Sequence, residues 1–188
     1  MRDGTATKEL IARTALRLFV EKGIAETTIR DIASAAGISE GAMYRHYTGK
    51  DALAWELFAT NFTHFASELE GLREKHPTLR AQIAAMIRTF CEFFDRDPIL
   101  FSYLLIAQHG QLKKVTPDMP HPLLVLRDTI AEGMKRGEIP KRDPMVATSM
   151  MLGLVLQVAT SKIYRRFEHS LTSLADTLVE ASWRVLAA

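Results

Sequence analysis

Two short helix signals flank a single glycine, Gly37, in the first part of the chain. Thr28 can cap the first of these helices, which we expect over residues 29–36, and Asp31 places a carboxylate in its first turn. Gly37 ends this helix because glycine adopts the left-handed backbone conformation at low steric cost. Ser39 can cap the helix that follows. The spacing therefore predicts a helix-turn-helix.

The second helix of this pair is expected to have an inward and an outward face. Met43 and Tyr47 lie four residues apart and are placed to pack inward. In a helix-turn-helix, the second helix can enter the major groove of DNA, and small residues such as Gly41 and Ala42 permit close approach. The side chains that can donate hydrogen bonds to phosphates are Tyr44, Arg45, His46 and Lys50. This segment is therefore predicted to bind DNA.

The segment from Thr28 to Lys50 resembles the DNA-binding segment of the tetracycline-repressor (TetR) family of bacterial regulators. The resemblance rests on Asp31-Ile32-Ala33, Ala36-Gly37-Ile38-Ser39 and Tyr44-Arg45-His46-Tyr47, and on Lys50 at the start of the next helix. It implies contact with DNA by Thr28, Arg30, Ser39, Gly41, Ala42, Tyr44, His46 and Lys50. Glu40 and Arg45 complete the candidate DNA-binding residues, because they share the outward face.

Each of these residues also has a plain structural interpretation. Helix-turn-helix spacing occurs in helical bundles that bind no DNA. Tyr44 and Tyr47 could both be core aromatics, of which we assign Tyr47 to the core, and Arg45 and His46 could be surface residues. Glu40 could accept a hydrogen bond from cytosine or only cap its helix. Several phosphate donors beside two capped helices favour DNA binding.

Composition agrees with a globular protein that makes few phosphate contacts. The chain has 188 residues, of which 47% are hydrophobic and 24% charged, and its net charge is +2. Residues 1–50 hold eight Lys or Arg and six acids, so the excess positive charge lies there. Cys91 is the only cysteine, which excludes an intrachain disulfide and a multi-cysteine metal site, and we assign it to the core. No metal or cofactor is predicted.

The remainder of the chain is expected to be helical, because no alternating strand pattern occurs in it. A long helix over about residues 51–75 is predicted to join the first three helices to a helical body. Further helices are expected over residues 78–96, 98–109, 121–136, 144–167 and 170–187, with a long loop at 111–120. The predicted fold is all-α, with a DNA-binding domain at 1–50 and an effector-binding and dimerisation domain at 51–188.

Nine of the fifteen aromatic residues fall between Trp55 and Tyr103. Aromatic stripes at helical spacing are usually packed core, but the family resemblance implies a small-molecule cavity in the body of each subunit. We therefore predict a hydrophobic or aromatic effector that contacts Phe62, Phe65, Met86, Phe90, Phe94, Phe101 and Leu104. The polar residues predicted to orient it are Gln108, His109 and Gln157.

The last two predicted helices carry apolar strips beyond what one core requires. These strips consist of Met150, Met151, Leu154 and Val158, with Gly153 for close approach, and of Leu171, Leu174, Leu178 and Val185. The resemblance implies a homodimer that joins through these helices, which would place two DNA-reading helices on a palindromic operator. The alternative is that both strips pack within one subunit.

The sequence thus predicts a ligand-responsive transcriptional regulator, a repressor that a hydrophobic small molecule releases from double-stranded DNA. Whether the ligand releases the protein from DNA or promotes DNA binding is left open. A second open alternative is a ligand-binding or adaptor protein that has lost operator recognition. An enzyme is not expected, because the six histidines are scattered and no catalytic motif is evident. The protein is expected in the cytoplasm and off the membrane, because the apolar run 145–158 is interrupted and too short to span a bilayer.

Overall fold

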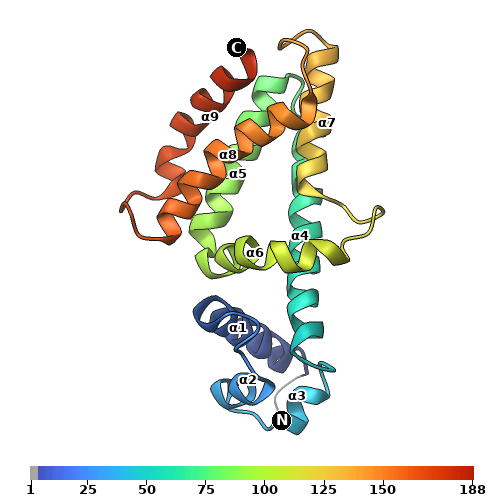
Figure 1. Ribbon diagram of the computed structural model, residues 1–188, viewed down its shortest axis with the longest axis vertical. Coiled ribbons are helices and arrows are strands. Elements are labelled where there is room, and N and C mark those ends of the chain that lie inside the picture. The colour runs from blue at the N-terminus through green and yellow to red at the C-terminus, as the bar shows by residue number, and fades with distance from the viewer. Residues whose placement is uncertain (1–3) are drawn as a thin grey trace. The chain divides into compact units, whose positions relative to one another are not determined.

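The computed structural model describes residues 4–188, apart from the side chain of His109, and this part of the chain contains helices and no strand (Figure 1). The all-α prediction is therefore confirmed. The α-helices are α1 (Gly4–Lys22), α2 (Ile29–Ala36), α3 (Glu40–Tyr44), α4 (Lys50–Lys75), α5 (Leu79–Arg96), α6 (Pro98–Gln111), α7 (Pro122–Lys135), α8 (Pro144–Ile163) and α9 (Leu171–Ala187). A short 3₁₀ helix, η1 (Leu112–Lys114), follows α6.

The helices form two compact units. The first unit extends to Asn61 and also includes Ile99–Met119, so it contains α1, α2, α3, the first half of α4, nearly all of α6, and η1. The second unit comprises Phe62–Pro98 and Pro120–Ala188. This structural division differs from the functional boundary at residue 50, which stays a prediction.

The first unit has a closely packed apolar core. Helix α1 packs against α2, and α2 packs against α3. The core side chains come from the α-helices of the unit and include Ile11, Phe19, Ile32, Met43, Leu53, Phe58 and Tyr103. Tyr47, which follows α3, is also buried, so its assignment to the core is confirmed. The three N-terminal helices are thus held around a common interior.

The second unit is built around α5. This helix packs against α9 and α7, while α8 packs against both α7 and α9. Its buried side chains include Met86, Phe90 and Phe94. Cys91 is also buried, as predicted, and burial raises the pKa of its thiol to about 11, so the thiol stays protonated and unreactive.

Asp95, near the C-terminal end of α5, caps a helix that lies far from it in sequence. Its carboxylate accepts hydrogen bonds from the backbone N–H of Leu171 at 3.0 Å and of Thr172 at 2.8 Å, and from the Thr172 hydroxyl at 2.8 Å. These N–H groups belong to the first turn of α9, which has no intrahelical acceptors for them. Asp95 therefore fixes the start of α9 against the end of α5.

Two predicted helix ends are wrong. Helix α8 ends at Ile163, not at residue 167, because Arg165 has φ 54°, in the left-handed region that terminates an α-helix. Helix α6 continues to Gln111 instead of stopping at 109, and η1 occupies part of the predicted loop.

Helix α8 is 20 residues long and apolar enough to cross a membrane by length and composition alone. The apolar run 145–158 is thus part of a longer helix, and the length of the run alone does not describe it. One face of α8 is nevertheless buried in the second unit through Ala147, Thr148, Met151, Val155 and Ala159. That face serves as protein core.

Ser182 offers a test of packing in α9. Its side chain is fully buried, and its hydroxyl oxygen has no hydrogen-bond partner among the described residues. We expect Ser182→Ala to raise the free energy of unfolding by about 1 kcal/mol, because an unsatisfied buried hydroxyl is removed and alanine favours helix. Urea denaturation measures the change. Ser173→Ala, which removes an exposed hydroxyl bonded to the Ser170 carbonyl at 2.8 Å, is the control and should not stabilise the protein.

Candidate DNA-binding site

The first helix of the helix-turn-helix begins with a reciprocal cap. The Asp31 N–H donates to the Thr28 hydroxyl oxygen at 3.1 Å, and the Thr28 N–H donates to the Asp31 carboxylate at 3.0 Å. The hydrogen bond from the Thr28 backbone is the main cause that lowers the pKa of Asp31. The carboxylate therefore stays ionised in the positive first turn of α2. The predicted cap at Thr28 is confirmed.

The turn between α2 and α3 has the predicted geometry. Gly37 has φ 65° and ψ 36°, the left-handed conformation, and its N–H donates to the Ser34 carbonyl at 3.1 Å. Ser39 then caps α3, because its hydroxyl oxygen accepts a hydrogen bond from the Ala42 N–H at 3.1 Å. Both ends of the turn are thus set by local side chains and by one glycine.

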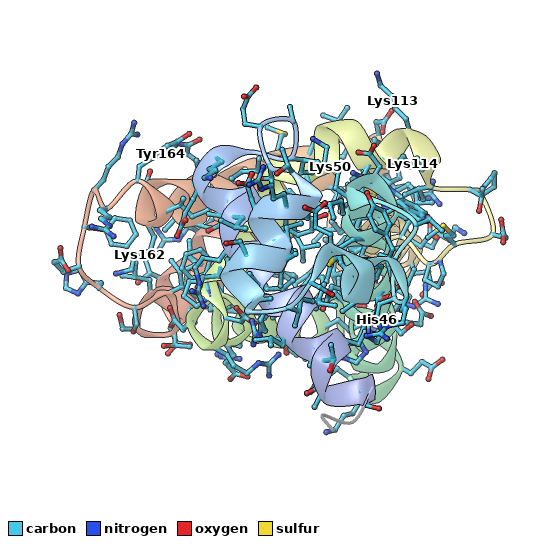
Figure 2. All side chains as sticks on the ribbon, turned by 90° about the horizontal axis from the view of Figure 1, so that it is seen from below. His46, Lys50, Lys113, Lys114, Lys162 and Tyr164 are labelled. Carbon is cyan, nitrogen blue, oxygen red and sulfur yellow. The ribbon has the colours of Figure 1, made fainter. Side chains whose placement is uncertain are left out.

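The ten candidate DNA-binding residues all keep accessible surface. Tyr44, an aromatic residue, leaves 55% of its surface exposed. Ala42, His46 and Lys50 are half-buried, and the others are exposed, namely Thr28, Arg30, Ser39, Glu40, Gly41 and Arg45. Figure 2 shows His46 and Lys50 on the first unit in the view from below. In α3, the side chains of Glu40 and Tyr44 are therefore exposed and could approach DNA.

Lys50 makes a contact that the sequence did not indicate. Its ammonium group donates to the carbonyl of Ala25, in the loop between α1 and α2, at 2.6 Å. The bond joins the start of α4 to the loop that precedes the helix-turn-helix. Because an ammonium group has three donors, two remain for other acceptors, and the predicted phosphate contact stays open to test.

A second group of contacts fixes the segment that follows α3. The Tyr47 hydroxyl lies 3.5 Å from the Glu56 carboxylate, which is paired with Lys8 of α1 at 2.7 Å. The Lys8 ammonium lies 5.6 Å from the centre of the Tyr47 ring. Burial, together with the Glu56 charge, raises the pKa of Tyr47 to about 12, so its hydroxyl stays neutral. These contacts connect α1, α4 and the end of α3.

The family described as bacterial regulatory proteins, tetR family, matches residues 11–57, a range that includes α2, α3 and the cap residues of both. This match, together with the relatives and solved structures below, supports a TetR-family transcriptional regulator. The chain is 36% identical to the HTH-type transcriptional regulator YerO of Bacillus subtilis over 113 residues, which are 57% of this chain and 39% of YerO. It is 22% identical to the fatty acid metabolism regulator protein of Bacillus subtilis, over 90% of each chain.

Solved structures share the fold of this chain. A tetR-family regulatory protein from Rhodococcus RHA1 has a TM-score of 0.79 at 17% identity, with 97% of each chain covered. The transcriptional regulator FadR from Bacillus subtilis, in complex with stearoyl-CoA, has a TM-score of 0.73 at 20% identity, with 93% of this chain and 96% of FadR covered. At this identity, the likeness establishes the fold alone.

The predicted effector residues are divided between the two units of the chain. Those in the second unit are Phe62, Phe65, Met86, Phe90, Phe94 and Gln157, and those in the first unit are Phe101, Leu104, Gln108 and His109. The side chain of His109 lies outside the described residues. A common pocket for this set stays a prediction.

Within the second unit, two of these aromatic residues pack against neighbours outside the predicted set. Phe65 stacks on Phe93 with ring centroids 5.4 Å apart. Phe62 meets the ring of His121 edge-on at 4.9 Å, a contact that the sequence did not indicate. Burial lowers the pKa of His121, and its neutral Nδ1 accepts a hydrogen bond from the Leu123 N–H at 3.2 Å, which caps α7.

An open cleft of about 400 Å³ lies between α4 and α7 in the second unit. Its lining residues are Ala66, Ser67, Glu70, Gly71, Glu74, Pro120 and Val125, none of which belongs to the predicted effector set. Gln157 is exposed on α8 in the single subunit, and its role in orienting an effector stays a prediction. It lies on the same side of α8 as Met150 and Gly153.

The predicted dimer surface is corrected in part. Met151, Leu171 and Leu178 are buried inside the subunit, so they are core residues and present no surface to a partner. Met150 is 54% exposed, and so is Val146 one turn earlier. The other predicted interface residues keep accessible surface, namely Gly153, Leu154, Val158, Leu174 and Val185. An apolar strip on α8 therefore remains available.

Proposed function

We propose that this chain is a ligand-responsive transcriptional repressor that binds a palindromic DNA operator as a homodimer in the cytoplasm. The observation that carries the proposal is the exposure of Tyr44 on a capped helix-turn-helix whose other aromatic, Tyr47, is buried. An exposed tyrosine beside Arg45, His46 and Lys50 provides hydrogen-bond donors for phosphates. The match to the TetR family supports the same assignment.

The proposed dimer uses the exposed strip of α8. Val146 and Met150 lie one turn apart and leave more than half of their surface accessible in the single subunit. Gly153 lies on the same side. Outside its own stretch of α8, no described atom lies within 4 Å of the position of a Cβ there, so a partner helix can approach. A two-fold dimer would present two copies of α3 to successive major grooves.

The proposed effector is a hydrophobic molecule, and we choose stearoyl-CoA as the first probe. The choice rests on the solved complex of Bacillus subtilis FadR with that ligand and on the fold that this chain shares with FadR. Effector binding is proposed to change the position of α4 and thereby the spacing of the two DNA-reading helices. Such a ligand acts only through different affinities for the two states, with a typical coupling of about 1 to 3 kcal/mol.

Selection of genomic fragments by the purified protein tests the DNA-binding proposal. A regulator should enrich one palindromic sequence, and its affinity for that duplex should fall as salt rises. An adaptor protein that has lost operator recognition would enrich no sequence, which would overturn the proposal. Addition of stearoyl-CoA to the protein–DNA complex then tests whether this ligand releases the protein from the operator.

Substitution of Tyr44 and Lys50 tests the phosphate contacts. We expect Tyr44→Ala or Lys50→Ala to weaken binding about tenfold to the operator and to unrelated duplexes alike, because phosphates carry no sequence information. Lys50→Ala should also reduce the slope of log affinity against log salt by about 0.9, since one phosphate contact is lost. Competition binding at several salt concentrations measures both effects.

Lys141→Ala is the matched control, because Lys141 is an exposed lysine in the loop between α7 and α8. It should leave both the affinity and the salt slope unchanged. Loss of affinity at one operator position only, with unrelated duplexes unaffected, would contradict the assignment of Tyr44 and Lys50 to phosphates.

A further inference from the structure

Helix α7 begins with a histidine as its cap. His121 is the N-cap residue, and Pro122, at the first helical position, has no N–H group. The Nδ1 atom of His121 accepts a hydrogen bond from the Leu123 N–H at 3.2 Å. The carbonyl oxygen of His121 accepts hydrogen bonds from the N–H groups of Leu124 at 3.0 Å and of Val125 at 3.1 Å. One residue therefore supplies the acceptors for the first three N–H groups of α7.

The side-chain caps of the other helices differ from His121 in their chemistry. The residues that cap α2, α3, α5, α8 and α9 are threonine, serine or aspartate, namely Thr28, Ser39, Thr78, Asp143 and Ser170. Their hydroxyl and carboxylate oxygens stay acceptors between pH 5 and pH 8, whereas an imidazole ordinarily changes its charge within this range. An imidazole accepts at Nδ1 only while that nitrogen carries no proton. Among these six caps, the cap of α7 is thus the one that acid can remove.

The surroundings of His121 favour a neutral ring. The residue is half-buried, and its ring meets the ring of Phe62, in α4, edge-on with centroids 4.9 Å apart. Burial lowers the pKa of His121, and no charged group of the described chain contributes to this shift. A proton on Nδ1 would point at the Leu123 N–H and would add positive charge to a helix end that is already positive. Protonation of His121 and capping by its side chain therefore exclude each other.

The charged residues on the segments around His121 do not titrate in the same range. Arg127 and Asp128, both in α7, pair with each other at 2.6 Å. The other flanking charges are acids that are ordinarily ionised above about pH 5, namely Glu70 and Glu74 on the cleft side of α4 and Asp118 before α7. His64, a second histidine of this part of the chain, is exposed and lies about 200° around α4 from Phe62. The titrating group at the start of α7 is therefore His121.

The first turn of α7 forms part of one wall of the open cleft between α4 and α7. Pro120 directly precedes His121, Val125 donates its N–H to the His121 carbonyl, and both residues line the cleft. Ala66 lines the cleft from α4 and follows Phe62 by about one helical turn. The cap and the contact between His121 and Phe62 thus hold the two walls together at one end of the cleft.

We propose that His121 is a pH-sensitive cap that closes one end of this cleft. The neutral imidazole holds the first turn of α7, whereas protonation removes the acceptor of the Leu123 N–H, opens this turn and releases the wall formed by Pro120 and Val125. Because the folded-state pKa is lowered, the contribution of the cap is fully present above the unfolded-state value of about 6.5. It is lost as the pH falls through the folded-state pKa. The device goes beyond the proposed function and does not depend on DNA binding.

Amide hydrogen exchange of the purified protein from pH 7.5 to pH 5.0, corrected for the intrinsic pH dependence of exchange, tests this inference. In the unmodified protein, protection of the Leu123, Leu124 and Val125 amides should fall about threefold to tenfold over this range, as expected for loss of one N-cap. His121→Asn keeps a side-chain acceptor that does not titrate, since asparagine is a preferred N-cap residue. This variant should fold and should keep its protection over the whole range.

His64→Gln is the matched control, because His64 is an exposed histidine in α4, and it should lose protection at α7 as the unmodified protein does. An equal loss in His121→Asn would assign the pH effect to another group, such as the carboxylates of the cleft, and would overturn the inference. Constant protection of the three amides in the unmodified protein would overturn it as well. Neither result bears on operator binding, so the proposed function is tested separately.

Discussion

Replacement of Gly133 by alanine is expected to lower the free energy of unfolding by about 2 kcal/mol, although alanine favours helices more than glycine does. Gly133 is buried in α7, and a Cβ added there would collide with the side chain of Leu79, at the start of α5. The Cβ of Leu79 itself would lie only 3.0 Å away, and no change of rotamer moves that atom. Leu79 is also held by the hydrogen bond from its N–H to the Glu138 carboxylate at 2.6 Å.

Gly71→Ala is the control for this prediction, because Gly71 lies in α4 with open space around the position of its Cβ. This substitution should raise the free energy of unfolding by about 0.5 to 1 kcal/mol. Urea denaturation at one fixed protein concentration compares the two variants, since the stability of a dimer depends on concentration. A stabilising effect of Gly133→Ala similar to that of Gly71→Ala would refute the close packing of α7 on α5.

A double-mutant cycle attributes the effect to Leu79. Leu79→Ala alone should cost about 3 kcal/mol, because it leaves a cavity at a fully buried site. The added methyl group of Gly133→Ala then occupies space that Leu79 has vacated. The double variant is therefore expected to be more stable than the sum of the two single changes predicts.

Replacement of Asp95 by alanine is expected to lower the free energy of unfolding by about 2 kcal/mol at pH 7, the second large effect. The change removes the acceptor for the N–H groups of Leu171 and Thr172. These groups then have no protein partner at the start of α9, whose first residue, Leu171, is fully buried. Chemical denaturation measures the loss.

The loss should depend on pH in a defined direction. Partial burial of Asp95 tends to raise its pKa, but the hydrogen bonds from Thr172 and Leu171 outweigh burial and lower the pKa below its ordinary value of 3.8. A carboxylate with a lowered folded-state pKa contributes stability that is fully present above the unfolded-state pKa. That contribution is lost as the pH falls through the folded-state pKa. The difference between Asp95→Ala and the unmodified protein should therefore be constant from pH 7 to pH 5 and should shrink below about pH 4.

Asp176→Ala is the matched control for Asp95. Asp176 pairs with Arg88 at 2.9 Å, but its side chain is 86% exposed, and such a pair contributes little to stability. Asp95→Asn keeps an acceptor without the charge, so it should lose less stability than Asp95→Ala. A loss for Asp176→Ala as large as that for Asp95→Ala would argue against a special role of the cap.

The sequence predicts those parts of the fold whose cause lies within a few residues. Thr28, Gly37 and Ser39 each act on backbone groups at most three or four positions away, so their roles could be inferred from residue type and spacing. The end of α8 was misplaced because Arg165 adopts a positive φ, which residue type does not indicate.

Contacts between distant segments could not be inferred in this way. Nothing near Lys50 indicates a bond to Ala25, and nothing near Asp95 indicates that it caps α9. Met150 and Met151 are chemically identical neighbours, yet one is 54% exposed and the other 1%. Helical periodicity alone does not say which side of an apolar helix its own subunit covers.

The division of labour in the helix-turn-helix has an evolutionary consequence. Thr28, Asp31 and Ser39 maintain the backbone of α2 and α3, while Glu40 and Gly41 carry no packing. Exchanges at these two surface positions therefore cost little folding energy. Proteins descended from this one can therefore acquire new DNA target sequences by substitution at positions 40 and 41, while the backbone of the two helices stays the same.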